Sequence, residues 1–223
     1  MPTDDTPLAP SAELRARVFA ATRAKPAPTR GQTFWRWSLA GFAGAALSAA
    51  IFVWAEGVRP GPRPDGLIAA TSIGAAIAAL IAAIVILGNR RAVLGPRLGV
   101  RVAVMVGLPL VLFIWKIAMS AQFSDMMVEW PERPGLRCLG LGTAMALGPF
   151  AAMVFVLRRT EPNHPRALGM SLGVIAAGGA WVLTDLWCPV AWPLHLLLGH
   201  VLPMVLLAAL GAGMGRWLGF GRP

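Results

Sequence analysis

The sequence predicts an all-α membrane protein, a six-transmembrane-helix bundle with both termini cytoplasmic. First, 57% of its 223 residues are hydrophobic and only 13% are charged, whereas about a quarter of the residues in soluble domains are charged. Second, six apolar stretches are long enough to cross a bilayer, which takes about 20 helical residues. Third, Lys and Arg gather in alternate connecting segments, which indicates an orientation in the membrane.

The expected spans are separated by segments rich in Pro, Gly and charge. We expect spans over Trp37–Ala55, Leu67–Gly88, Gly99–Ser120, Leu139–Leu157, Ala167–Trp187 and Pro193–Trp217. Residues 1–36 then form a cytoplasmic N-terminal tail, residues 37–218 the transmembrane domain, and residues 219–223 a cytoplasmic C-terminal tail. The N-terminal tail lacks the apolar run and cleavage site of a signal peptide, so the first span is expected to remain as an anchor.

The basic residues predict which side each segment faces. The N-terminal tail holds six Lys and Arg residues and the second and fourth loops hold three each, whereas the first and third loops hold two each and the fifth none. Basic loops stay in the cytoplasm, so both termini are expected inside a bacterial inner membrane. The net charge of +10 is then explained by topology, with the lipid bilayer as partner and no direct binding of nucleic acid.

Charged residues near the spans are expected to serve topology rather than transport. Arg101 and Lys116 lie near opposite ends of the third span, where long side chains can extend toward the headgroups. No acidic residue is expected deep in a span, since Asp185 lies close to the outer end of the fifth. An intramembrane ion relay, which needs partnered charges at depth, is therefore not expected.

Small residues and prolines recur within the spans. Spacing of the GxxxG kind, which allows helices to approach closely, occurs at Gly169 with Gly173 and at Gly211 with Gly215. We favour packing inside one bundle over a dimer motif. Each proline within a span removes a backbone donor and is expected to kink its helix; these are Pro109, Pro149 and Pro203.

The two cysteines are the most informative residues. Cys138 opens the fourth span and Cys188 follows the fifth, so the topology places both at the outer face, where disulfides persist. Three interpretations remain open: two small packing residues, a structural disulfide, or a reactive thiol pair that oxidises or binds a soft metal ion. His195 and His200 follow at the outer half of the last span as candidate auxiliary ligands, with His195 nearer the aqueous surface.

The N-terminal tail contains one expected helix, from a cap at Ser11 through about Ala24. Leu14 and Val18 would line one side with Phe19 beside them, and Arg15 would lie elsewhere on the helix. A helix this short is marginal alone. It could fold on a partner protein, lie on the anionic inner leaflet, or remain a disordered tail that only sets topology.

The sequence carries no catalytic motif that we can identify. A dinucleotide fingerprint, a P-loop, an HExxH zinc motif and a nucleophile elbow are all absent from it. We therefore expect a protein that is not an enzyme.

Several residues of the C-terminal half together resemble one family. They are Cys138, Pro149, Arg158 with Arg159, Cys188 with Pro189, Pro193, His200, and Arg216 with Trp217. This pattern, over about residues 137–218, resembles the NrsF (negative regulator of sigma F) family of bacterial membrane anti-sigma factors. The resemblance implies six spans, a cytoplasmic N-terminal segment that holds an extracytoplasmic-function sigma factor, and an outer-face cysteine pair that senses the signal.

The expected function is thus a membrane-bound anti-sigma factor that releases its sigma factor on an envelope, metal or redox signal. Cys138 and Cys188 would be the sensing pair, with a soft metal ion as candidate ligand. The candidate contacts to the sigma factor are Leu14, Arg15, Val18 and Phe19. The alternatives are a membrane thiol-disulfide oxidoreductase, a small transporter, or a structural membrane subunit.

Overall fold

The computed structural model describes residues 11–24, 30–58, 63–87, 96–127, 132–157 and 164–218, and in these it is helical with no strand. The chain divides into two compact units, residues 1–36 and residues 37–223. The basic loop residues Arg90, Arg91, Arg158 and Arg159 and the C-terminal tail from residue 219 lie outside the described residues.

Helix α1, Ala12–Ala24, forms where the sequence predicts it. Ser11 caps it, since the Leu14 amide donates to the Ser11 hydroxyl at 3.2 Å, which satisfies one of the amides left unpaired at a helix start. An exposed ion pair between Arg17 and Glu13, 2.6 Å long, follows on the next turn.

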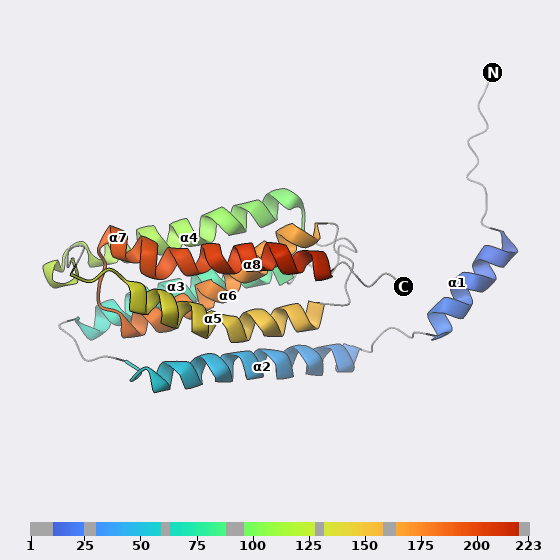
Figure 1. Cartoon of the computed structure of the whole chain (residues 1–223), viewed down its shortest axis with the longest axis horizontal. Helices are drawn as coiled ribbons and strands as arrows, with labels where there is room; N and C mark the ends of the chain where they lie inside the picture. Colours follow the sequence, from blue (N-terminus) through green and yellow to red (C-terminus); the bar gives the residue numbers. More distant parts are fainter. Residues whose placement is uncertain are drawn as a thin grey trace, which may run out of the picture. The chain divides into compact units, whose positions relative to one another are not determined.

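Six further helical segments are long and apolar enough to cross a membrane, as expected of a membrane protein, and Figure 1 shows them side by side. They are α2 Arg30–Trp54, α3 Asp65–Leu87, α4 Leu98–Ser120, α5 Leu136–Leu157, α6 Pro165–Trp187, and a last span made of α7 Pro193–Leu196, the π-helical η2 Leu197–Val201 and α8 Leu202–Leu218. A 3₁₀ turn, η1 Ser124–Met126, follows α4. The helices expected over these ranges are confirmed within a few residues, except that α2 begins at Arg30 rather than Trp37.

Helix α6 is the centre of the bundle and α2 is at its edge. Of the residues in the most apolar stretch of α6, 72% are buried, against 11% in that of α2. Glycines bring α6 and α8 into backbone contact: a Cβ on Gly169 would collide with Gly211, and one on Gly173 with Leu207. The GxxxG pairs therefore pack within this chain, as expected. The large exposed apolar side chains lie on the outer faces of the helices, where lipid can solvate them.

The expectation for Lys116 is wrong. Its side chain is 1% exposed and pairs with the buried Asp185 carboxylate, instead of extending toward the headgroups. The second carboxylate oxygen accepts from Thr71 at 2.6 Å and from Ser72 at 2.9 Å. Partnered charge is thus present inside the bundle. Because a buried carboxylate needs both a countercharge and hydrogen-bond donors, Asp185 of α6 holds α3 and α4 against its own helix.

The expectation for Arg101 is also wrong. This residue is 1% exposed, and its guanidinium donates to the His164 carbonyl at 2.8 Å. His164 precedes α6, so Arg101 ties the start of α4 to the start of α6. A carbonyl inside the protein, rather than a headgroup, is its partner.

Candidate thiol and imidazole site

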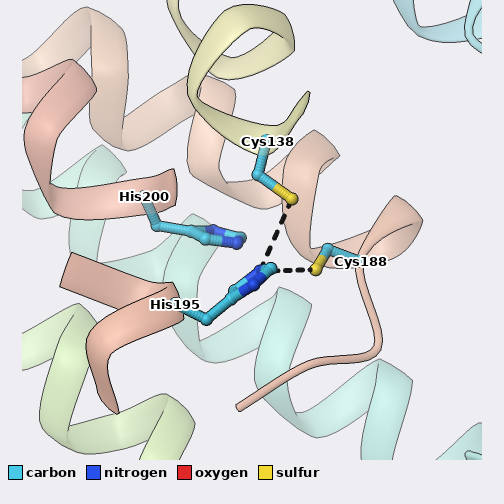
Figure 2. Close-up of side chains that lie close together, drawn as sticks. All are labelled: Cys138, Cys188, His195 and His200. Carbon is cyan, nitrogen blue, oxygen red and sulfur yellow. Dashed lines mark hydrogen bonds between the residues drawn. The ribbon is translucent and has the colours of Figure 1, made fainter. Parts of the chain in front are cut away.

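Four potential metal ligands converge where α5 begins and α6 ends. Cys138 lies in the first turn of α5, Cys188 directly follows α6, His195 is in α7 and His200 is in η2. All four are buried, and their ligand atoms lie within 4.8 Å of one another (Figure 2). The chain thus brings together residues 57 positions apart. Among the described residues both thiols are free of a disulfide.

His195 faces both sulfur atoms with one ring nitrogen. Its Nε2 is 3.1 Å from the Cys188 Sγ and 3.6 Å from the Cys138 Sγ. Its Nδ1 is 2.7 Å from the carbonyl oxygen of Arg133. A carbonyl only accepts, so Nδ1 carries the proton and Nε2 presents a lone pair to the thiols. Metal-binding histidines are oriented by the same kind of hydrogen bond.

His200 is the fourth potential ligand of the group and lies beside His195. Its ring centre is 5.0 Å from that of Trp181 and 5.7 Å from that of His195, and Figure 2 shows the ring directed toward Cys138 and His195. Neither ring nitrogen has a hydrogen-bond partner among the described residues. Buried polar atoms are rarely left unpaired, so a ligand that these nitrogens could bind would remove an energetic cost.

Two glycines allow the segments to meet at this distance. Gly135, just before α5, has a φ of +86°, which favours glycine, and a Cβ there would lie 2.9 Å from the His195 carbonyl oxygen. A Cβ on Gly199 would lie 2.9 Å from the Cβ of Cys138. Pro203 has no N–H to donate back into the preceding turn. The π-helical segment η2, a kind often found at functional sites, ends two residues before Pro203 and carries His200.

A cavity of about 340 Å³ opens onto the site. Cys138, Cys188 and His195 contribute to its wall, together with Arg133 and Arg137. The Arg137 guanidinium lies 4.9 Å from the ring centre of Trp187, within the range of a cation–π contact. The cavity gives a small ligand a route to the thiols.

Arg63 holds the chain segment that carries Cys188. Its guanidinium donates to the carbonyl oxygens of Asp185 at 2.8 Å and Leu186 at 2.9 Å, and more weakly to that of Cys188 at 3.4 Å. These carbonyls lie at the C-terminal end of α6, where no further helical amide can pair with them. Burial lowers the pKa of the Arg63 guanidinium, while Asp185 opposes that shift.

The neighbours of Cys188 favour its thiolate form. Cys138 lowers the pKa of the Cys188 thiol most, burial opposes this, and His195 adds to the lowering. A thiolate, not a thiol, is both nucleophile and metal ligand.

The distances suit a tetrahedral ion. Bond lengths of about 2.3 Å to sulfur and 2.0–2.1 Å to nitrogen place sulfur and nitrogen ligands roughly 3.5–3.6 Å apart in a tetrahedron. The observed 3.6 Å to Cys138 equals that value, and the observed 3.1 Å to Cys188 is shorter, so the Cys188 side chain would move slightly away from His195 to admit an ion. Two cysteines with two histidines are a donor set that zinc and softer ions of the same geometry favour.

A comparison with protein-family models shows which family the chain belongs to. The model of the family described as NrsF, negative regulator of sigma F, matches residues 21–219. The chain belongs to the NrsF family. It is thus a negative regulator of a sigma factor, and its sigma factor is its protein partner. The match includes the first three spans, beyond the region that carried the sequence resemblance. Searches of curated proteins and of solved structures each found no match.

The predicted site residues fall into two groups in this NrsF protein. All four cysteine and histidine candidates meet in one cluster. Leu14, Val18 and Phe19 lie on α1 with between 52% and 64% of each side chain exposed, in the other compact unit. With Arg15, also exposed, they precede the first residue matched by the family.

Sequence reasoning missed the residues that position the cluster. The Arg133 carbonyl that orients His195, the Trp181 ring beside His200, and Arg63 at the end of α6 were not singled out. The adjacent Pro134 and Gly135 are typical of a turn, but a turn does not say which side chain its carbonyls will meet.

Proposed function

We propose that this NrsF protein is a membrane anti-sigma factor that holds an extracytoplasmic-function sigma factor at the bacterial inner membrane. It releases that factor when a metal ion binds to Cys138, Cys188, His195 and His200. Family membership supports the regulatory role, and the clustering of four buried ligands beside a cavity supports the sensing role. We propose that the protein works by binding and not by catalysis.

The N-terminal segment is the proposed sigma contact. Leu14 and Val18, four residues apart, share one side of α1, and Phe19 lies beside them; all three are exposed. Burying such side chains against a partner is favourable. The concentration of basic residues in this segment and in the second and fourth loops supports a cytoplasmic N-terminus, and that orientation places the cysteines at the periplasmic face.

A metal ion would act by changing how the helices pack at the site. Its ligands come from the start of α5, the residue after α6, and both parts of the last span before α8. Binding can shift a two-state equilibrium only by its difference in affinity for the two states. A tenfold weaker hold on the sigma factor needs about 1.4 kcal/mol of such difference.

The two imidazoles favour metal binding over disulfide formation as the signal. A disulfide uses only the sulfur atoms, whereas His195 directs Nε2 at both sulfurs and His200 has two unpaired nitrogens among the described residues. An ion would engage all four side chains. Oxidation would instead remove two electrons and two protons from the thiols, and a peroxide reduced to water could accept them.

Co-purification of the sigma factor tests the proposal. The parent protein and the Cys138→Ser, Cys188→Ser double variant are purified from cells with and without added Cd²⁺. We expect Cd²⁺ to reduce bound sigma factor at least tenfold in the parent and to leave the double variant loaded. His164→Ala, which removes the histidine outside the cluster, serves as control and should behave as the parent does.

Three outcomes separate the possibilities. Equal release from parent and double variant would show that the thiols do not sense the signal. Release by peroxide but not by Cd²⁺ would identify the pair as a redox sensor. A parent protein that purifies without any sigma factor would contradict the anti-sigma function.

A further inference from the structure

We propose that helix α2 transmits the state of the thiol and imidazole site to the N-terminal segment. This inference rests on the proposed function only in taking the site as one that binds a ligand. In Figure 1, α2 lies along α5 at the edge of the bundle. We call α2 a lever because of three features. Its C-terminal end contacts the site, its middle is fixed to α5, and its N-terminal stretch is loosely packed against α5.

The C-terminal end of α2 touches the site directly. Phe52 packs against a buried cluster formed by Cys138, Trp187, Cys188 and Val190. The indole N–H of Trp187 donates to the carbonyl of Ala55, just past the end of α2, at 2.8 Å. A rearrangement of the cysteines must therefore displace side chains on which α2 rests.

The middle of α2 is fixed to α5 by one polar contact. Pro149 cannot donate the helical hydrogen bond that the Met145 carbonyl would otherwise accept. The Ser48 hydroxyl of α2 takes that place and donates to the Met145 carbonyl oxygen at 2.6 Å. This buried contact satisfies the carbonyl that proline leaves unpaired.

Close backbone contact surrounds this hydrogen bond. A Cβ on Gly44 would lie 2.9 Å from the Cα of Pro149, and a Cβ on Gly148 would lie 3.0 Å from the Gly44 carbonyl oxygen. Small residues permit such an approach in membranes and are hard to replace there. Gly44 and Ser48 of α2 with Met145, Gly148 and Pro149 of α5 form what we call the pivot.

From the pivot toward the N-terminal end of α2, the two helices do not pack tightly against each other. An apolar groove of about 150 Å³ runs between them, lined by Trp37, Ala40, Gly41 and Ala45 of α2 and by Pro149, Ala152, Met153 and Val156 of α5. This stretch of α2 has space to move against α5. The arms of the lever are nearly equal, about 12 Å from Gly44 to Phe52 and about 10 Å from Gly44 to Trp37 at 1.5 Å per residue.

Two glycines of α2 with different surroundings, Gly41 and Gly44, supply the test. Gly44→Ala inserts a methyl group into the pivot, whereas a Cβ on Gly41 meets nothing within 4 Å, so Gly41→Ala is the matched control. Spin labels on encoded non-cysteine side chains at Leu39 and Phe155, both exposed, report the distance between α2 and α5 in full-length protein in lipid nanodiscs. The distance is measured with and without Cd²⁺.

We expect Cd²⁺ to change the label distance in the parent and in Gly41→Ala, and to change it by less than half as much in Gly44→Ala. Ser48→Ala, which removes the polar contact without adding bulk, gives the same test should Gly44→Ala fail to fold. An unchanged distance in the parent, or equal changes in all variants, would overturn the proposal.

The sigma factor gives a separate readout. In the parent, Cd²⁺ should weaken sigma binding about tenfold, and in Gly44→Ala less than about threefold, because broken coupling between two sites removes the effect of one on the other. A label distance that responds to Cd²⁺ while sigma affinity does not would refute the proposed function and leave the lever intact. Sigma release with a fixed label distance would refute the lever alone.

Discussion

Replacing Lys116 by Met should destabilise the bundle strongly, because it leaves the Asp185 carboxylate buried without a countercharge. Both side chains are 1% exposed, so water screens neither. Removing one partner of a buried ion pair costs about 3–5 kcal/mol. Thr71 and Ser72 still donate to the carboxylate in the variant, and hydrogen bonds to a charged group contribute about 1.5–3 kcal/mol each. We therefore expect a loss near the lower end, about 3 kcal/mol.

The double variant Lys116→Met, Asp185→Asn distinguishes the effect of unpaired charge on stability from the effect of altered packing. It contains neither charge and keeps an amide that can meet the two hydroxyls, so it should recover to within about 1 kcal/mol of the parent, as other buried pairs do when both charges are removed. Reversible unfolding in lipid bicelles, with both single variants and the double variant, gives the coupling energy of the pair. Glu13→Gln, in the exposed pair with Arg17, is the control and should show no measurable change.

A coupling energy near zero would contradict this prediction. It would mean that Lys116 and Asp185 do not depend on each other in the folded protein. A double variant as unstable as Lys116→Met would also contradict it, because the loss would then come from packing rather than from unpaired charge.

Three further predictions concern topology, the ligands and the tail. In a Cys138→Ser, Cys188→Ser background, an impermeant thiol reagent should label Val58→Cys in intact cells and Gly31→Cys only after the inner membrane is opened; the reverse pattern would invert the topology. His195→Ala should weaken Cd²⁺ binding at least tenfold, of the order found when metal-site partners are lost, as measured by titration of purified protein; unchanged affinity would exclude its Nε2 as a ligand. Ser11→Ala should destabilise α1 by about 1 kcal/mol, seen as reduced helix content by circular dichroism of the N-terminal peptide in a helix-supporting solvent, and an unchanged spectrum would show that the cap is dispensable.

The six spans could be predicted because the signal is spread over many residues. Each span contains about 20 mostly apolar residues bounded by Pro, Gly and charge, so an error at one position changes little. The start of α2 could not be predicted from the sequence. Arg30 and Gln32 are polar, and their hydropathy does not indicate that a helix continues through them. The structure begins α2 at Arg30 nonetheless.

The cysteine and histidine cluster could be predicted in part. Cys138 and Cys188 were expected on the same face from loop charges that do not involve cysteine, and the two histidines follow in the next span. Their convergence depends on the close contact of Gly135 and Gly199 with neighbouring backbone. Glycine in sequence does not name the residue it will touch, so the distances could not be derived.

The ion pair of Lys116 and Asp185 was missed for a physical reason. Both residues lie near helix ends, where a long side chain ordinarily reaches water or headgroups. Whether it turns inward depends on the neighbouring helices, here on the Thr71 and Ser72 hydroxyls of α3. Hydroxyls in an apolar helix commonly bond to their own backbone and give no sign of a tertiary partner.

The sequence predicts the acceptor of the hydrogen bond from Ser48 to Met145 but not its donor. Pro149 indicates that the carbonyl four residues earlier has no helical donor. The sequence does not say which helix supplies the replacement. Only the packing of α2 against α5 identifies Ser48.

In the proposed mechanism, a ligand on Cys138, Cys188, His195 and His200 weakens the hold on the sigma factor. The most direct test measures the affinity of purified protein in nanodiscs for Cd²⁺, with and without saturating sigma factor. Because coupling between two binding sites is reciprocal, we predict that sigma factor weakens Cd²⁺ binding by the same factor, about ten, by which Cd²⁺ weakens sigma binding. Equal Cd²⁺ affinity in both conditions would exclude coupling between the two sites.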